Sequence, residues 1–437
     1  NDGQILPLKN TEKVAFIGGF AKKPRFQGGG SSHINCFKIT NALDSVPSDA
    51  QVIYAEGFPA DKDLYDDTLA AEALKAAGEA DKVVIFAGLP DSFESEGYDR
   101  SHMRLPDCQN RLIAEILKVQ PNAVIVLHNG SPVEMPWLND VKGLLEAYLG
   151  GQAGGAAVAN ILYGKVNPSG KLAETMPLKL SDNPSYLNFG GGEKVEYREG
   201  VFVGYRYYDT KEMDVAYPFG YGLSYTTFAY SNLNISNGNP TEKDTISVSV
   251  DVTNTGDMTG KEVVQLYVKD CTNSAIRPEK ELKGFEKVAL DPGETKTVTM
   301  ELDKRSFAWY NTDLHDWFAA SGEYKILIGA SSRDIRLESK IQLNSSQEIP
   351  LHVHMNTTLG ELFRNPKTAE TAKKLTASYL SVLNGGEESV SDAASEAISE
   401  EMTLAMTDSM PLRALMSFGE FSREELLDIV EKLNKLI

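Results

Sequence analysis

The sequence predicts a mixed architecture: an open, largely parallel α/β sandwich domain, then an immunoglobulin-like β-sandwich, then a mainly helical tail. Three patterns support this prediction. Continuous apolar runs alternate with amphipathic stretches over residues 1–212, polar–apolar alternation dominates residues 213–345, and residues 346–437 end in an amphipathic helical pattern. With 437 residues, the chain has room for about two to four domains.

Three apolar runs mark the expected strands of the first region: Val14–Gly19, Val83–Gly88 and Ala123–Leu127. Runs without alternation fit strands that are buried on both faces, as in a parallel sheet. Amphipathic patterns predict helices over these ranges: 64–77, 109–119 and 156–162. Alternating strands and helices indicate an open sheet that is covered by helices on both faces.

This topology also locates the candidate site. In open parallel sheets, the loops that contact ligands leave the carboxyl ends of the strands. Three loops meet this condition: 18–37, 88–106 and 128–137.

The second region, residues 213–345, has the pattern of antiparallel strands. Ile246–Val252 alternates strictly between apolar and polar residues, as a half-buried strand requires. Val263–Val268, Thr295–Leu302 and Tyr324–Ile328 repeat the pattern, and no helical stretch lies between them. Strands at this spacing predict a sandwich of immunoglobulin-like architecture.

The third region, residues 346–437, contains two distinctive segments. Residues 384–401 are rich in Gly, Ser, Glu and Ala, which predicts a linker or a solvated helix. Ser422–Glu425 has the sequence of a capping box and precedes an apolar stripe that includes Leu426 and Leu433. We expect the tail to have too little apolar surface to fold alone, so that this stripe packs on another domain.

Composition excludes several classes of function. The chain has 43 Lys and Arg against 62 Asp and Glu, and its net charge of −19 repels phosphate backbones and anionic lipids. We therefore expect no nucleic-acid binding and no membrane binding, and no apolar run approaches the ~18 residues that span a bilayer. Cys36, Cys108 and Cys271 lack the spacing of a disulfide framework or zinc site, which favours a reducing compartment.

The loop 88–106 is the most informative segment for chemistry. It contains four carboxylic residues: Asp91, Glu94, Glu96 and Asp99. Clustered carboxylates disfavour one another's ionised forms, so we expect a raised pKa for at least one of them. A carboxyl group that keeps its proton near neutral pH can serve as a general acid.

Two neighbours refine this hypothesis. Gly97 leaves room for the carboxyl group of Glu96 to approach a ligand, and we expect Arg100 to hold Asp99 ionised. The alternative interpretation is a solvated acidic surface loop. Spacing alone does not choose between Glu94 and Glu96 as the general acid.

The loop Arg25–His33 contains three successive glycines, Gly28–Gly30. Their N–H groups could cradle a phosphate, but the Lys-Ser/Thr of a P-loop and a helix-opening G-x-G-x-x-G are absent. We therefore expect no nucleotide site. A loop of Gly, Ser, Gln and His suits a hydroxyl-rich ligand about as well as it suits a plain turn.

Two further clusters have structural interpretations. His352 and His354 are expected to form an exposed pair on an edge strand rather than a metal site. The Tyr-rich segment Tyr197–Tyr208 closely precedes the sandwich, which favours packing between domains over a sugar-binding platform. We expect neither a metal nor a cofactor.

Several segments together resemble the C-terminal part of β-glucosidases of glycoside hydrolase family 3. Ser95–Arg100, Ser-Glu-Gly-Tyr-Asp-Arg, resembles the acid/base loop of that family. Other matching segments are Asn1–Leu8, Asn129–Trp137, Gly150–Pro177, Tyr197–Tyr208 and Tyr217–Phe228. Asn254–Gly256 and Arg277–Phe285 resemble its fibronectin type III-like domain, and the tail is similar to that of some bacterial members.

The resemblance implies a retaining mechanism with two carboxylates. An Asp nucleophile lies in a preceding (β/α)8 barrel, and a Glu general acid/base reaches over from the α/β domain. Glu96 matches the position of this acid/base. Gly29, Ser31 and Tyr98 are the candidates for contacts with the sugar. The expected substrate is a β-glucoside, followed by a β-xyloside and an α-L-arabinofuranoside.

The barrel and its nucleophile motif have no match in this chain, and Asn1 begins on the approach to a strand. We therefore expect the chain to be the C-terminal part of an exo-acting β-glycosidase, incomplete alone, that needs a barrel domain or a barrel-bearing partner chain. The alternative is a non-catalytic carbohydrate-binding or scaffold piece. The expected setting is bacterial carbohydrate metabolism in the cytoplasm, and the sequence leaves a homo-oligomer open.

Overall fold

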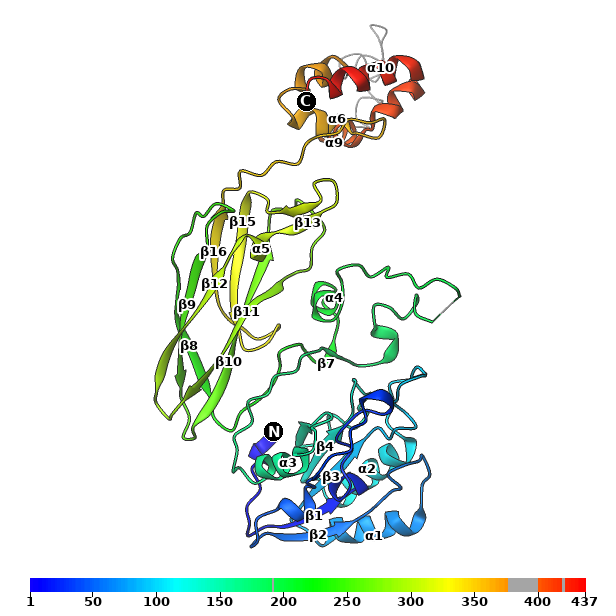
Figure 1. The fold of residues 1–437 in the computed structure, drawn as a ribbon, viewed down its shortest axis with the longest axis vertical. Helices are drawn as coiled ribbons and strands as arrows, with labels where there is room; N and C mark the ends of the chain where they lie inside the picture. Colours follow the sequence, from blue (N-terminus) through cyan, green and yellow to red (C-terminus); the bar gives the residue numbers. More distant parts are fainter. Residues whose placement is uncertain (191, 376–399, 419–420) are drawn as a thin grey trace. The chain divides into compact units, whose positions relative to one another are not determined.

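The computed structural model describes residues 1–190, 192–375, 400–418 and 421–437 (Figure 1). These residues form two compact units. The first contains residues 1–310 and 317–346, and the second contains residues 311–316 and 347–437. The linker or helix expected at 384–401 lies outside the described residues up to residue 399, and helix α9 begins at Glu400.

The first unit begins with a five-stranded parallel sheet in the order β2-β1-β3-β4-β5 (Figure 1). Its strands are β1 (Lys13–Ile17), β2 (Gln51–Ala55), β3 (Lys82–Gly88), β4 (Ala123–His128) and β5 (Gly143–Glu146). The three apolar runs predicted as strands form β1, β3 and β4, and side chains on both of their faces are buried.

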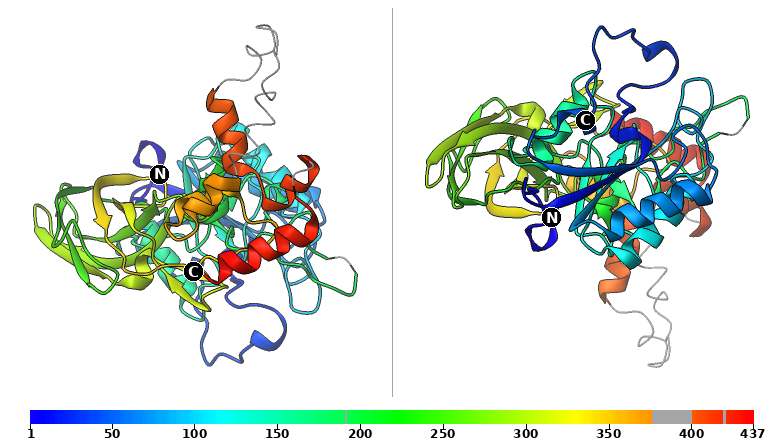
Figure 2. Two further views of the ribbon diagram at one scale, coloured as in Figure 1. Left: turned by 90° about the horizontal axis from the view of Figure 1, so that it is seen from above. Right: turned by 90° about the horizontal axis from the view of Figure 1, so that it is seen from below.

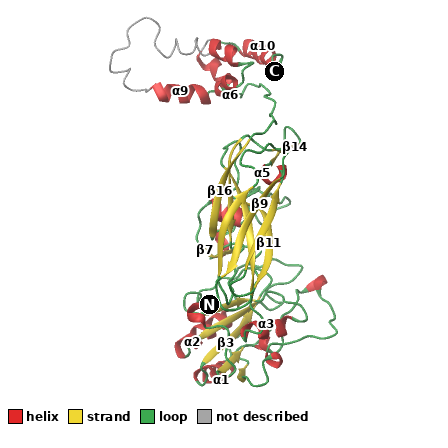
Figure 3. Cartoon of the chain, turned by 90° about the vertical axis from the view of Figure 1, so that its left-hand side faces the viewer, coloured by secondary structure: helices red, strands yellow, loops and turns green. Residues whose placement is uncertain are grey.

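Helices cover both faces of this sheet, as expected. Helices α1 (Asp67–Gly78) and α2 (Asp107–Val119) share one hydrophobic core with the sheet, and α3 (Gly154–Leu162) belongs to the core on the opposite face (Figure 3). Helix α1 begins later than the predicted residue 64. The cause is Asp66, whose carboxylate accepts hydrogen bonds from the first free N–H groups of the helix.

The strand order places a topological switch point between β1 and β3. The chain leaves β1 toward β2 on one side, and it leaves β3 through α2 toward β4 on the other side. Ligand sites of open α/β sheets lie outside the carboxyl ends of the strands at such a point. Figure 2 shows the long segment between β1 and β2, in dark blue, extending away from the sheet.

A two-sheet sandwich follows, in the orders β11-β10-β15-β16 and β12-β9-β8 (Figure 3). Its elements are β8 (Phe228–Ile235), β9 (Ile246–Asn254), β10 (Gly260–Asp270), β11 (Glu281–Leu290), β12 (Thr295–Leu302), α5 (Lys304–Phe307), β13 (Trp309–Asn311), β14 (Asp316–Phe318), β15 (Gly322–Gly329) and β16 (Ile335–Leu343). Alternate residues of β9 are buried in the core, as the sequence predicted. The short helix α5, capped by Asp303, was not predicted.

Residues 176–217 form the segment that connects the α/β domain to the sandwich, called the connecting segment below. It contains β6 (Met176–Pro177), α4 (Tyr205–Thr210) and β7 (Val215–Tyr217). Part of its Tyr-rich stretch packs on the sandwich, as expected. The hydroxyl of Tyr205 accepts a hydrogen bond from the Leu282 N–H, and its ring contacts Tyr267. By contrast, Tyr197 is 81% exposed.

The second unit contains α6 (Leu359–Arg364), α9 (Glu400–Ser409) and α10 (Arg423–Asn434). The capping box predicted at Ser422 and Glu425 is present. However, the expectation that the tail cannot form its own core is wrong. Leu426 and Leu433 of α10 are fully buried among side chains of the same unit, which include Leu359, Leu362, Leu412 and Leu415.

Within the described ranges, no helix is long and apolar enough to cross a membrane.

Candidate active site

The predicted site loops meet beyond the carboxyl ends of β1, β3 and β4. Arg25 and Ser31 lie in the segment after β1, and Glu94 and Glu96 lie in the loop after β3. Gly130 belongs to the loop after β4. Side chains and backbone groups of these three loops contact one another, so the site is built at the switch point of the sheet.

An ion pair joins the first two loops. Arg25 Nη1 donates to Glu94 Oε2 at 2.7 Å, and Nη2 donates to the Glu94 carbonyl oxygen at 2.8 Å. The third nitrogen, Nε, donates to Asp91 Oδ1 at 3.2 Å. The Arg25 side chain is 5% exposed and that of Glu94 is 18% exposed, so this pair is largely withdrawn from water.

The third loop also binds Glu94. The Gly130 N–H donates to Glu94 Oε2 at 2.7 Å, and the Ser131 hydroxyl donates to Oε1. A Cβ atom at residue 130 would lie 3.1 Å from both carboxylate oxygens, so glycine allows the backbone to approach this closely. Glu94 therefore connects the loops that follow β1, β3 and β4.

Glu96 has different surroundings. Its carboxylate is exposed, and it accepts hydrogen bonds from the backbone N–H and the hydroxyl of Ser31, the latter at 2.9 Å. Gly30 has a φ of +82°, and a side chain there would collide with Glu96. The glycine-rich loop thus brings Ser31 against the carboxylate that the sequence singled out.

The other predicted sugar contacts lie close by. A side chain at Gly29 would collide with the Ser95 hydroxyl, so this glycine lets the first loop approach the second. The Tyr98 hydroxyl donates to the Asp91 carbonyl oxygen at 2.5 Å, while 52% of the residue is exposed. The ring of Tyr98 is therefore tethered at its hydroxyl and accessible to a ligand.

The role expected for Arg100 is partly wrong. Its hydrogen bonds connect it to the loop after β4 and not to Asp99: Nη1 donates to the Ser131 hydroxyl at 2.7 Å and to the Pro132 carbonyl oxygen at 3.1 Å. Asp99 is exposed. Arg100 therefore fixes the loop through neighbours that are distant in the sequence.

For Glu94 and Glu96, the two candidate acids, the expected raised pKa is wrong. Burial opposes ionisation of Glu94, but hydrogen bonds from Ser131, Gly130 and Arg25 hold the pKa of this carboxyl below its ordinary value. The two hydrogen bonds from Ser31 likewise lower the pKa of Glu96. For both carboxyl groups, hydrogen bonds from donors in neighbouring loops outweigh the effect of burial.

Carboxyl groups with raised pKa values lie deeper at the same edge, and no sequence motif predicted them. Burial raises the pKa of Glu146 to about 8, although Tyr148 and Asn129 donate hydrogen bonds to it. Burial also raises the pKa of Glu174, which accepts a hydrogen bond from the Tyr148 hydroxyl at 2.9 Å. A single Glu at the end of a short strand has no distinctive sequence pattern.

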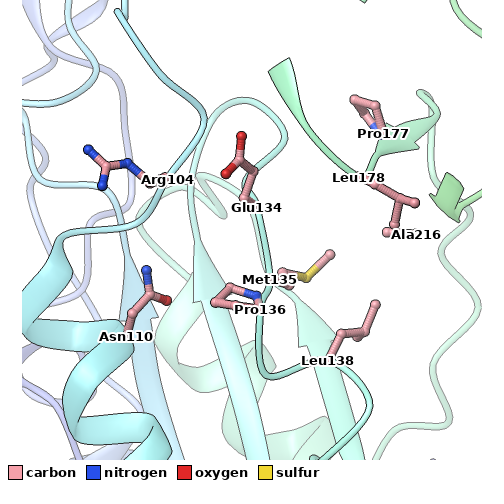
Figure 4. A pocket seen from close by; sticks show the side chains of 9 residues that line it. All are labelled: Arg104, Asn110, Glu134, Met135, Pro136, Leu138, Pro177, Leu178 and Ala216. Atoms are coloured by element: carbon pink, nitrogen blue, oxygen red, sulfur yellow. The ribbon is translucent and has the colours of Figure 1, made fainter. Parts of the chain in front are cut away.

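Two cavities lie apart from the Glu96 carboxylate. One has a volume of about 270 Å³ and an apolar lining that includes Met135, Leu138 and Leu178. Figure 4 shows Arg104 and Glu134 above Met135 and Leu138. A larger cavity of about 810 Å³ borders the connecting segment, and its lining includes Arg100, Ser131, Glu174, Glu199 and Tyr208.

The structure also describes the surroundings of the two histidines and of Cys108. His352 and His354 do not lie on a strand, which corrects the expected edge-strand pair, although both side chains are exposed. In the described part of the chain, no cluster of three potential metal-binding side chains occurs. Burial raises the pKa of the Cys108 thiol to about 12, which agrees with an unreactive cysteine.

Comparison with protein families gives two matches. Residues 1–225 match the glycosyl hydrolase family 3 C-terminal domain. The chain belongs to glycosyl hydrolase family 3. Residues 262–332 match a fibronectin type III-like domain, which agrees with the β-sandwich observed there. The resemblance read from the sequence is therefore confirmed for both domains.

Curated proteins of this family are longer than this chain. The thermostable β-glucosidase B of Acetivibrio thermocellus is 49% identical over 443 residues, which include all of this chain and 58% of the relative. The exo-α-(1→6)-L-arabinopyranosidase of Bifidobacterium longum is 45% identical over 347 residues, which cover 77% of this chain and 45% of that enzyme. The family 3 chain thus spans about half the length of these relatives.

Solved structures of β-glucosidases also match this chain over part of their length. The family 3 β-glucosidase of Bifidobacterium adolescentis superposes with a TM-score of 0.79 at 44% identity, covering 86% of this chain and 55% of that chain. The β-glucosidase of Kluyveromyces marxianus in complex with glucose gives a TM-score of 0.73 at 30% identity, covering 79% of this chain and 60% of that one.

Proposed function

We propose that this chain supplies the general acid/base Glu96, and part of the sugar-binding surface, to a retaining exo-acting β-glycosidase. The nucleophilic carboxylate comes from a (β/α)8 barrel on another segment of the protein or on a partner chain. One observation carries the proposal. Glu96 presents an exposed carboxylate at the switch point that accepts hydrogen bonds from Ser31, whereas Glu94 is occupied by Arg25 and the loop after β4.

The chemistry needs two carboxyl groups about 5–5.5 Å apart on either side of the scissile bond. Glu96 gives its proton to the glycosidic oxygen while the C–O bond breaks and the nucleophile bonds to the anomeric carbon. The carboxylate of Glu96 then takes a proton from water, whose oxygen displaces the nucleophile. Glu96 therefore ends the cycle protonated, as it began.

The electrostatic state of Glu96 fits the second step directly. Hydrogen bonds from Ser31 lower the pKa of this exposed carboxyl, so it is ionised near neutral pH and can act as a base. The first step needs the proton. Covering Glu96 with a sugar and a barrel would remove it from water, which raises the pKa of a carboxyl group.

The relatives support a β-glucoside as the substrate, because several of them are named β-glucosidases. A second candidate is an α-L-arabinopyranoside, since two Bifidobacterium enzymes with that activity are 45% and 46% identical to this chain. We propose Ser31 and Tyr98 as the side chains that contact the sugar, with Gly29 keeping the first loop close to the second.

Replacing Glu96 by Gln in the assembled enzyme tests the proposal. Deglycosylation should slow by ~10²–10⁴-fold, because the amide cannot accept the proton of water. Azide needs no base and should restore turnover, with glycosyl azide as the product. Asp99→Asn, which neutralises an exposed carboxylate in the same loop, is the matched control and should retain wild-type rates.

A non-catalytic carbohydrate-binding or scaffold role makes the opposite prediction. In that case Glu96→Gln would leave every rate unchanged, and azide would have no effect on either variant.

A further inference from the structure

One carboxylate joins the three loops around the proposed acid/base. Glu94 accepts hydrogen bonds from Arg25 in the loop after β1 and from Gly130 and Ser131 in the loop after β4. Arg25 additionally donates to the backbone carbonyl oxygen of Glu94 at 2.8 Å. Its guanidinium therefore holds both the side chain and the main chain at a position two residues before Glu96.

The segment after β1 holds the acid/base loop at two places. Arg25 binds Glu94, and six residues further along Ser31 binds the Glu96 carboxylate. The glycines between them let the segment pass close to Ser95 and Glu96, where a Cβ atom at Gly29 or Gly30 would collide. The position of Glu96 thus depends on where Arg25 anchors this segment.

The contact between Arg25 and Glu94 is largely buried. The Arg25 side chain is 5% exposed and that of Glu94 is 18% exposed, so neither charge can exchange its partner for bulk water. Both oxygens of Glu94 already accept hydrogen bonds from protein donors. Removal of the Arg25 charge leaves Glu94 buried without its ion-pair partner, and removal of the Glu94 charge leaves Arg25 with the longer contact to Asp91 at 3.2 Å. In both cases the loops must rearrange.

We propose that Arg25 and Glu94 are positioning residues, which hold the loop after β3 so that the carboxyl group of Glu96 is aimed at the glycosidic oxygen. This inference rests on the proposed function of Glu96. Proton transfer requires a donor within hydrogen-bond reach of its acceptor, and a misplacement of about 1 Å can slow a reaction by roughly 10²-fold. Neither residue needs to touch the substrate.

The test is the dependence of kcat/KM on the leaving group, measured with the assembled enzyme on a series of aryl β-glucosides. General-acid assistance matters most for poor leaving groups, because good ones depart without a proton. In Arg25→Lys, which keeps the charge but loses the fork geometry, kcat/KM should fall by about 10²-fold for the poorest leaving group and little for the best. If Arg25 acted on stability alone, the variant would lower kcat/KM equally for all substrates.

Two further variants support the measurement. Glu94→Gln keeps the shape of the side chain and should steepen the leaving-group dependence in the same way. Ser131→Ala removes one hydrogen bond to Glu94 and offers a milder test if the first two variants fold poorly. Arg104→Lys is the matched control, because Arg104 forms an exposed ion pair with Asp107 at 3.4 Å, and it should behave as wild type.

The outcomes separate the two proposals. A wild-type leaving-group dependence in folded Arg25→Lys, Glu94→Gln and Ser131→Ala overturns the positioning role, even if Glu96→Gln is impaired. A wild-type dependence in Glu96→Gln overturns the acid/base role itself. Amide hydrogen exchange of this chain gives an independent readout: Arg25→Lys should increase exchange in residues 91–100 and leave that of β3 and β4 unchanged.

Discussion

Arg25 and Glu94 lie 69 residues apart in the chain, and Nη1 of the arginine donates to Oε2 of the glutamate at 2.7 Å. The contact arises from topology. The two residues follow adjacent parallel strands, β1 and β3, whose carboxyl ends meet at the switch point of the sheet. It also distinguishes the two candidate acids, because the ion pair occupies the carboxylate of Glu94, whereas that of Glu96 is exposed.

The isolated chain should not hydrolyse aryl β-glucosides. A retaining glycosidase needs a nucleophile as well as an acid/base, and only the acid/base is assigned to this chain. The measurement is nitrophenol release by the pure chain, before and after addition of the separately expressed barrel segment of a relative. Sustained turnover by the chain alone would refute the division of roles.

Glu146 should make the chain less stable as pH rises from 6.5 to 8. Its folded-state pKa of about 8 exceeds the ordinary value of 4.5, so the folded state retains a proton that the unfolded state has released. The free energy of unfolding should therefore fall with pH, by at most about 1.4 kcal/mol per pH unit. Denaturant unfolding at several pH values measures this slope.

The matched variants for this measurement are Glu146→Gln and Glu72→Gln. The first removes the titrating group and should flatten the slope between pH 6.5 and 8. The second changes an exposed residue of α1 and should leave the slope unchanged. The range begins at 6.5 because burial lowers the pKa of His128 to about 4, so this histidine affects stability only below its ordinary value of 6.5. An unchanged slope in Glu146→Gln would contradict the assignment.

The second unit should lose stability when its core is truncated. Leu433→Ala removes a fully buried side chain of α10 and should lower the free energy of unfolding by about 2–5 kcal/mol. Leu427→Ala, on the same helix but 46% exposed, should change it by much less. Thermal unfolding of the full chain, followed by calorimetry, compares the two. Equal effects would indicate that α10 is not anchored by its own core.

The connecting segment should become less exposed to solvent when a barrel segment is bound. The segment exposes several large apolar side chains that are close together in the sequence, among them Leu187 at 91%, Phe189 at 62% and Tyr197 at 81%. Exposed apolar side chains that form a patch mark an interaction site. Leu187→Asp and Tyr197→Asp should weaken co-purification with a barrel segment and leave the melting temperature of this chain unchanged. Wild-type co-purification of both variants would exclude this contact.

Much of the fold could be predicted because its patterns are local. Continuous apolar runs identified β1, β3 and β4, because these strands are buried on both faces. Strict alternation identified β9, because only one face of that strand is buried. The tail was misjudged because its core combines segments that are far apart in the sequence. Leu359 and Leu362 of α6 meet Leu433 of α10 in a core that no single helical stripe reveals.

The site was predicted in part for the same reason. Gly97, Ser31 and Glu96 occur in short motifs, so sequence singled them out. The partner of Glu94 could not be deduced, because linear spacing does not say which loop brings a guanidinium to which carboxylate. The direction of the pKa shift in the acidic loop was therefore wrong: it depends on donors from Arg25 and Ser131, which lie in other loops.

The most direct test of Glu96 is the intact mass of the assembled Glu96→Gln enzyme during turnover of dinitrophenyl β-glucoside. This leaving group departs without a proton, so the first step proceeds, while the missing base delays hydrolysis. The polypeptide that carries the nucleophile should accumulate one covalent glycosyl group, and azide should remove it. Wild-type turnover with no glycosyl group, or accumulation in Glu94→Gln instead of Glu96→Gln, would contradict the assignment of Glu96 as the acid/base.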